Sequence, residues 1–458
     1  MVLDLYLAWK TDPRLSIGVA LGNDAYKVDS RYNALFISPR VRDVISCLHE
    51  QEFIDLAKGS YNRTGTGKGN RTTRIRSAQR LVDLFNDIGL EPHELSHNHK
   101  KECIVLKDHD VDEFGEPIRK KGRKKSKDIP YEDTPETFSM REELNTYNAL
   151  LAETYIDIPT LREPHIYRTK TDGTTQRMPI DQTNKFVRRI FGRGAWDMNG
   201  RFYGGWWQQV GKDLRAQIKI NDLPIAEIDY RSLHVAILSA KKGIIDGQGD
   251  RCDLGTQILP QLDLKQQRAA VKQLVLTALN AKTEKTAFSA FRHEQTKGSL
   301  EKTLSDVQLR QLLRAFIKKH PHLEPDLCSD QGINLIYTDS QITEIVLKKF
   351  TERQRPVLSI HDSYIVQTTD VRLLQEAMSE ARKKLTGIHL AVEQEIPGYD
   401  YIMSLRGVDR DLHLDTFKEV LPSKKDTQEY CERLIRFINY RKKNYESTYR
   451  LDRYYNHY

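Results

Sequence analysis

The feature that most constrains this chain is an apolar segment, residues 224–238, that carries an acid between a strand-like part and a helix-like part. The first part, IAEIDY, has the β-branched and apolar residues typical of a buried strand. The second, RSLHVAILSA, continues with the apolar spacing of a helix. Asp229 falls near the carboxyl end of the strand. An ionisable group there indicates either a solvated turn or an active site.

A second apolar segment, residues 355–367, has the tripeptide HDS between two apolar halves. The pattern predicts a hairpin with Asp362 at or near its turn. Two buried strands that each deliver an aspartate to one place need counter-charge. A pair of Mg²⁺ ions supplies that charge, activates a 3′-hydroxyl and stabilises a pyrophosphate leaving group. Mg²⁺ prefers one or two carboxylates plus substrate phosphates, which suits two aspartates.

A third segment, residues 266–281, lies between the other two and has a helical pattern. Arg268, Lys272, Leu276 and Asn280 recur every four residues, which places them along one slowly drifting helix face. Two cations one turn apart can clamp a triphosphate. The same spacing is also typical of a solvated helix face.

In order and spacing, these segments resemble the palm and fingers of single-subunit, family A-type nucleic-acid polymerases, the DNA polymerase I and phage-type RNA polymerase group. Motif A of that family begins Asp-Tyr-Ser in the DNA enzymes, and here Asp229 opens DYR. Motif C is His-Asp-Glu or, in the RNA enzymes, His-Asp-Ser, and here Asp362 is the centre of HDS. Residues 199–220 are similar to the family's Thr-Gly-Arg segment, so Arg201 would contact primer or template. The resemblance covers residues 196–405.

The resemblance implies a role for each matching residue. Asp229 and Asp362 would hold two Mg²⁺ ions, which Mn²⁺ can replace. Lys272 would contact the phosphates of a nucleoside triphosphate and act as general acid toward pyrophosphate. Arg268 would bind the γ-phosphate, and His361 would shape the hairpin near the primer terminus.

Three positions depart from the family pattern near the implied nucleotide site. Motif B reads Arg-x₃-Lys-x₃-Phe-x₃-Tyr in the family, but Leu276 replaces the Phe and Asn280 the Tyr that stacks by the templating base. His234 stands where DNA enzymes have Glu and RNA enzymes Gly. Its bulk favours a DNA product, whereas Ser363 favours RNA. The sugar of the product and the fidelity of the enzyme therefore stay open.

Three functions fit this sequence. We expect first a template-directed polymerase, with DNA synthesis on a DNA template preferred and primer-making RNA synthesis as the alternative. A template-independent terminal transferase would use the same metals. A non-catalytic DNA-binding replication protein with a degenerate palm is the third, although such a protein has no reason to keep two buried acids. The first 190 residues show no clustered acids typical of a 3′–5′ exonuclease, so no proofreading is expected.

The N-terminal part resembles a winged-helix domain, in which a basic hairpin touches nucleic-acid phosphates. A helix is expected from Ser38, with Pro39 at its first position. Two strands then flank the loop SYNRTGTGKGNRT, and a helix ending at Gly89 follows. A small α+β domain with a solvated hairpin is the alternative. The loop's GTGKG is no P-loop, because position 62 is Asn and position 69 is Gly.

The predicted fold class is α+β, a right-hand polymerase palm with an antiparallel sheet and helical fingers and thumb. The expected divisions are a winged-helix-like domain over 1–110, a basic polar linker over 111–135, a helical thumb-like region over 136–195 that includes a helix over 181–192, palm and fingers over 196–405 with the fingers at about 245–330, and basic aromatic helices over 406–458. In the last region, tyrosines among Arg and Lys suit base stacking and phosphate contact. A surface helix with its aromatics packed on the body is the alternative.

Composition limits the remaining classes. The 458 residues carry a formal net charge of +8, which favours polyanionic partners such as nucleic acid but is also found in ordinary basic proteins. The chain has no apolar run long enough to cross a membrane and no signal-peptide pattern at its start. Its five cysteines are scattered, which favours a reducing cytoplasm and disfavours a structural zinc site. The sequence predicts no oligomeric state.

Overall fold

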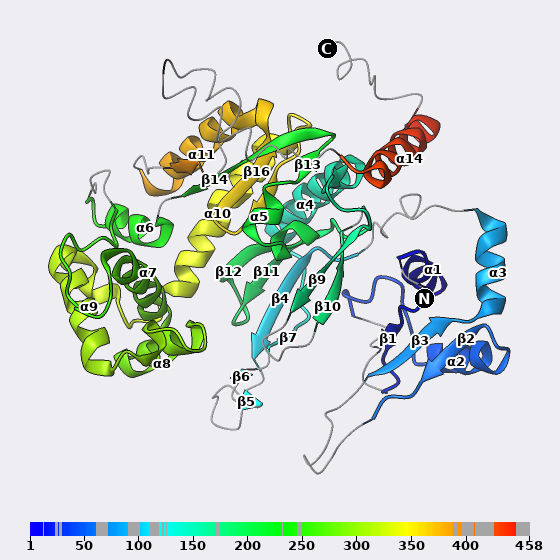
Figure 1. Ribbon diagram of the computed structural model, residues 1–458, viewed down its shortest axis with the longest axis horizontal. Helices are drawn as coiled ribbons and strands as arrows, with labels where there is room; N and C mark the ends of the chain where they lie inside the picture. The colour runs from blue at the N-terminus through cyan, green and yellow to red at the C-terminus, as the bar shows by residue number, and fades with distance from the viewer. Residues whose placement is uncertain are drawn as a thin grey trace.

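The protein has an α+β fold in which several small sheets are joined by helices (Figure 1). The computed structural model describes residues 1–11, 13–22, 26, 30–60, 72–89, 101–109, 119–120, 123–124, 126–169, 175–180, 182–230, 232–244, 250–387, 392–394, 407 and 426–445. Among them, the N-terminal unit has its own hydrophobic core. A second, larger core runs through most of the remaining elements.

The N-terminal unit is a three-stranded antiparallel sheet covered by helices, with strand order β1-β3-β2. Its elements are α1 (Val2–Thr11), β1 (Ile17–Val19), α2 (Val41–Glu50), β2 (Ile54–Ala57), β3 (Thr73–Ser77) and α3 (Gln79–Ile88). The predicted order of helix, strand, strand and helix is confirmed, as is the stop at Gly89, which has a left-handed φ of 65°. The helix predicted from Ser38 begins later, at Val41, because residues 38–40 form a turn closed by the Val41 N–H to the Ser38 carbonyl. The loop over 61–71 lies outside the described residues.

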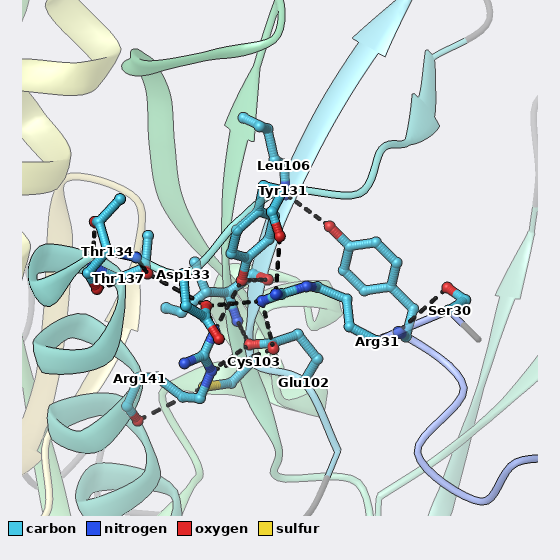
Figure 2. Close-up of polar contacts among 12 residues, drawn as sticks. Ser30, Arg31, Glu102, Cys103, Leu106, Tyr131, Asp133, Thr134, Thr137 and Arg141 are labelled. Carbon is cyan, nitrogen blue, oxygen red and sulfur yellow. Dashed lines mark hydrogen bonds and ion pairs between the residues drawn. The ribbon is translucent and has the colours of Figure 1, made fainter.

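An arginine cluster joins the N-terminal unit to the rest of the chain (Figure 2). Arg31 stacks over the Tyr131 ring at 3.7 Å and donates to the Tyr131 carbonyl at 2.9 Å. Its guanidinium also pairs with Asp133 at 3.0 Å, and Arg141 reaches the same carboxylate at 2.6 Å. Glu102 accepts from both arginines, so two cations and two anions close a charge-balanced network.

The body begins earlier than the predicted boundary at residue 110. Strand β4 (Ile104–His109) lies in a four-stranded sheet of order β12-β11-β4-β7, parallel to β11. The predicted linker over 111–135 is also wrong in part, because β7 (Ser126–Asp128) pairs with β4 in that sheet. Two short strands, β5 (Arg119–Lys120) and β6 (Arg123–Lys124), pair with each other. The sequence did not predict these strands, because the region is highly charged and neither its composition nor its hydrophobic period indicates burial.

Among the described residues of the expected helical thumb, 136–195, only those at the start form a helix. Helix α4 (Pro135–Glu153) begins with a capping box between Thr134 and Thr137. The other elements of this range are strands: β8 (Ile156–Asp157), β9 (His165–Thr169), β10 (Thr175–Pro179), β11 (Val187–Gly192) and the first residue of β12 (Ala195–Gly204). The helix predicted over 181–192 is wrong, because burial alternates along β11 with the period of two that marks a strand.

The central sheet has the strand order β15-β16-β14-β13-β8, and β17 pairs with the last three residues of β14, 228–230. Its remaining strands are β13 (Lys219–Ile220), β14 (Leu223–Tyr230), β15 (Leu358–Ile360), β16 (Ser363–Gln367) and β17 (Val392–Gln394). The hydroxyl of Tyr230 donates to Met378 of α11 (Val371–Thr386), and that of Tyr364 bonds Thr343 of α10 (Gly332–Thr351). These two helices therefore cover one face of the sheet. The other face is covered by a 3₁₀ turn, η3 (Trp206–Gln209), and α5 (Lys212–Arg215).

Residues 250–331, within the expected fingers, form helices and turns grouped at one end of the molecule (Figure 1). The elements are α7 (Leu264–Asn280), α8 (Glu284–Glu294), η4 (Glu301–Thr303), α9 (Asp306–Lys319) and η5 (Pro321–Asp326). Each of the three α-helices starts with a capping box. Helix α6 (Leu233–Lys241) connects the central sheet to this group, and α10 contacts both α6 and α7.

In the C-terminal region the structure describes one long helix, α14 (Gln428–Tyr445). Tyr430 and Phe437 are buried against Tyr155, with ring centroids 5.9 and 5.2 Å away. Arg433 pairs with the buried Asp157 at 2.8 Å. Tyr430 and Phe437 are therefore packed on the body, as the alternative predicted, and are not available for base stacking. Residues 408–425 and 446–458 of the predicted region lie outside the described residues.

One close contact fixes β12 against α10. Gly200 has a φ of 73°, and a Cβ there would lie 2.7 Å from the Ser340 hydroxyl and 3.1 Å from Phe191. On the other side of the pair, Arg189 donates to the Gly200 carbonyl at 3.0 Å and pairs with Glu344 of α10 at 2.5 Å. The strand and the helix therefore approach too closely for any side chain at position 200.

Gly200→Ala should lower the free energy of unfolding by about 2–4 kcal/mol, because it adds both backbone strain and overpacking. Gly255→Ala is the matched control, since Gly255 has nearly the same φ, 72°, and nothing within 4 Å of its added Cβ. That control should lose about 1 kcal/mol from strain alone. Urea unfolding measures both variants, and equal losses would contradict the close β12–α10 contact.

Candidate active site at the end of the central sheet

The two aspartates singled out by the sequence meet at one end of the central sheet. Strands β14 and β16 are antiparallel, and their register pairs Asp229 with Ser363. Asp362 directly precedes that partner, in the turn of the predicted β15–β16 hairpin, and its carbonyl accepts from the Tyr230 N–H at 3.4 Å. Asp229 and Asp362 are both partly exposed, while Ile228 and Tyr230 are buried. The sheet thus presents two neighbouring carboxyl residues at the edge of an apolar core.

The hairpin turn is tight and is tied to the strand beside it. His361 adopts a left-handed φ of 55°, which a non-glycine residue holds only under tertiary constraint. The Ser363 hydroxyl lies 3.1 Å from a carboxylate oxygen of Glu227 and 3.2 Å from the Ile360 carbonyl, and it can donate to either. Glu227 is buried and is held by the Arg215 guanidinium through two bonds of 2.8 and 2.9 Å. These contacts explain a serine at position 363 by its role in the hairpin, without any role in selecting the sugar of the product.

Arg201 lies near this end of the sheet, paired with a buried carboxylate. The Nε and Nη2 atoms of Arg201 bind Asp339 Oδ2 at 2.8 and 2.6 Å, and the Asp339 side chain is fully buried. Burial raises the pKa of Asp339 to about 6; Arg201 opposes the rise and the negative charge of Asp362 adds to it. Asp339 was not predicted from the sequence. The feature that could have indicated it is an acid on the apolar stripe that Leu335 and Ile342 form along one helix.

His234 lies in the first turn of α6, next to these charges. Both of its ring nitrogens are buried, and within the described part of the chain neither has a hydrogen-bond partner. Burial lowers the pKa of His234 to about 4, and the positive charge of Arg201 acts in the same direction, while Asp362 opposes it. The imidazole is therefore neutral at physiological pH. It brings bulk, but no charge, to the surroundings of Asp362.

The four motif B residues lie on the exposed face of α7, as their spacing predicts. Arg268, Lys272 and Asn280 are exposed and Leu276 is partly exposed, while the opposite face of the helix packs into the main core. Arg268 forms an ion pair with Asp250. The exposure fits both the phosphate-binding hypothesis and its alternative of a solvated face.

Asn280, at the end of α7, meets the start of α10. Its amide lies directly over Gly332, where an added Cβ would come within 1.9 Å of the Asn280 Oδ1 atom. This contact joins the helical group to the helix that backs the sheet. Of the predicted site residues, the structure thus groups Asp229, Asp362, Arg201, His234 and His361 at the sheet end. The motif B residues lie along the neighbouring α7.

A cavity of about 370 Å³ lies between the end of α7, the start of α10 and the sheet of β4 and β12. Asn199, Tyr203 and Asn280 contribute polar groups to its wall. Tyr203 also packs edge-on against His361, with ring centroids 5.9 Å apart, so the cavity lies beside the hairpin. Its two basic residues are each matched by an acid: Lys107 pairs with Asp128 at 2.9 Å, and Arg193 pairs with Asp330 through two bonds of 2.9 Å.

The carboxylates fit Mg²⁺ by chemistry and placement. Asp229, at the end of β14, and Asp362, in the adjoining hairpin turn, would offer hard oxygen ligands, and both are partly exposed. Across the described ranges, no group of three or more His, Cys, Asp or Glu side chains is arranged to hold a metal ion. Mg²⁺ does not require one, because substrate phosphates and water complete its coordination.

The chain matches no protein-family model and no curated protein sequence. In the described part of the chain, no helix has the length and apolar character needed to cross a membrane.

The depressed pKa of His234 predicts a stability change with pH. In the unfolded chain an imidazole titrates near pH 6.5, but in the folded protein near 4. The unfolded state therefore binds more protons between these values, so acidification from pH 6.5 to 4 should remove about 3 kcal/mol of stability. His234→Gln should abolish this component.

Urea unfolding of both proteins at pH 7 and pH 4.5 measures the difference, since other groups titrate equally in the two. His293→Gln is the control, because that side chain is 77% exposed. A His234→Gln variant with the pH dependence of the wild type would show that His234 is not buried in its neutral form.

Proposed function

We propose that this chain is a nucleic-acid polymerase that extends a 3′-hydroxyl by nucleotidyl transfer. The observation that carries the proposal is the β14–β16 register, which brings Asp229 and Asp362 together at the end of a buried antiparallel sheet. These are the two acids that the family A-type resemblance selects. Divalent metal ions bound to a nucleoside triphosphate would suit two neighbouring carboxylates, because they supply positive charge and bind hard oxygen ligands.

In the proposed reaction the 3′-hydroxyl of the primer loses its proton to water, its oxygen attacks the α-phosphorus, and the bond to pyrophosphate breaks as the new phosphodiester forms. Asp229 and Asp362 would hold two Mg²⁺ ions, which lower the pKa of the 3′-hydroxyl and neutralise charge on the leaving group. Lys272 and Arg268, exposed on one face of α7, would bind the β- and γ-phosphates. Lys272 would then give a proton to pyrophosphate.

The architecture supports this assignment in general form. The central sheet with α10 and α11 would be the palm, and the helices of residues 250–331 the fingers. Within the described part of the expected thumb, α4 is the helical element. The N-terminal unit, with its β1-β3-β2 sheet, would act as a winged-helix-like domain that binds nucleic acid. We place the enzyme in the cytoplasm.

DNA synthesis on a DNA template is the favoured form of the reaction. Ser363 has a structural use in the hairpin, which removes the main argument for an RNA product. His234 is a bulky, neutral side chain next to the carboxylates, and bulk at that position would crowd a 2′-hydroxyl. The template would pass near Tyr203 and Asn280, which line the cavity beside the hairpin.

A primer-extension assay with each dNTP and NTP, with and without template, tests the proposal. The wild type should extend a primed DNA template with dNTPs and Mg²⁺. Asp229→Asn and Asp362→Asn should each lose at least about 1,000-fold in rate, because each removes a charged metal ligand.

Asp213→Asn is the control, because Asp213 is an exposed carboxylate on α5, at the opposite face of the sheet from α10. It should keep the wild-type rate. No incorporation by the wild type with Mg²⁺ or Mn²⁺ would rule out the polymerase, and extension without template would instead identify a terminal transferase. An Asp362→Asn variant with full activity would show that the metal site is wrongly placed.

A further inference from the structure

The ion pair between Arg201 and Asp339 poses a problem of charge at the proposed metal site. Arg201 is only 17% exposed and keeps its charge at every physiological pH. Asp339 and Asp362 are the two carboxylates that act most strongly on it. A guanidinium that bonded Asp362 would occupy an oxygen that a metal ion needs and would repel the metal.

The structure holds the guanidinium on the other carboxylate. Two of its nitrogens, Nε and Nη2, both contact Asp339 Oδ2, so one edge of the Arg201 fork is engaged in the interior. The backbone on both sides of this bond is fixed, because Gly200 is packed on Ser340 and Arg189 clamps the Gly200 carbonyl to Glu344. Asp339 therefore pairs with a side chain whose backbone is held in place.

Asp339 is fully buried, where an acid has a high desolvation cost, and it lies on α10 in direct contact with Arg201. A role limited to stability would be served as well by a neutral pair of similar volume.

We propose that Asp339 is a positioning residue that holds Arg201 away from Asp362, so that Asp229 and Asp362 keep their negative charge for divalent metal ions. Arg201 then keeps its free edge for the nucleic acid. This inference rests on the proposed function, because it takes Asp229 and Asp362 as metal ligands. It differs from a structural role in predicting a change of metal affinity that depends on the presence of Arg201.

Binding of Mn²⁺ to the full chain, followed by electron paramagnetic resonance without nucleotide, tests the inference. Asp339→Asn should weaken Mn²⁺ binding about tenfold, which corresponds to about 1.4 kcal/mol, because the released guanidinium pairs with Asp362. The double variant Arg201→Gln with Asp339→Asn should return to within about twofold of the wild type, because it has no cation to release.

Glu143→Gln is the matched control. It also removes an acid that forms an ion pair with α10, but its partner is Lys348, so Mn²⁺ affinity should not change. Thermal melting of every variant separates loss of fold from loss of metal. Unchanged Mn²⁺ affinity in Asp339→Asn, or a double variant as weak as Asp339→Asn, would overturn the inference.

The same titration distinguishes this inference from the proposed function. If Asp362→Asn does not weaken Mn²⁺ binding, the metal site itself is wrong and both proposals fail. If Asp362→Asn weakens binding while Asp339→Asn does not, the metal site stands and only the positioning role of Asp339 fails.

Discussion

The contact between β12 and α10 determines how the parts of this protein meet. Gly200 lets the strand and the helix approach to a distance at which the Arg201–Asp339 ion pair can form in the interior. Helix α10 also contacts α4, α6, α7 and α11, so it links the central sheet to the helical group of residues 250–331. A change in the β12–α10 spacing would therefore move α7 relative to the carboxylates. The proposed phosphate-binding face and the proposed metal site are connected through this one helix.

Among the described residues, Asp229, Asp362 and Asp339 lie at the end of the central sheet, where Arg201 pairs with Asp339. His234 is neutral there at physiological pH. A raised pKa at Asp339 is the expected response of a buried acid to desolvation and to a neighbouring negative charge. In the proposed function, divalent cations would offset the negative charge of Asp229 and Asp362.

The sequence predicted an element correctly where the hydrophobic period and the types of its individual residues indicated the same structure. The β14 strand, the hairpin around Asp362 and the exposed stripe of α7 were all expected and are present. The prediction of a helix over 181–192 failed because a short segment with few apolar residues does not distinguish a period of two from one of 3.6. Asp339 was missed for another reason. A buried acid is compatible with its helix only because Arg201, 138 positions earlier, supplies the charge.

Localised cleavage by iron tests whether Asp229 and Asp362 together bind divalent metal. Fe²⁺ replaces Mg²⁺ at such oxygen sites, and with ascorbate and peroxide it generates radicals that cut the backbone next to the metal. We expect cuts at two places, near residue 229 and within residues 361–363, and we expect excess Mg²⁺ to suppress them. Cuts confined to other parts of the chain, or cuts at these places that Mg²⁺ does not suppress, would contradict metal binding by these two aspartates.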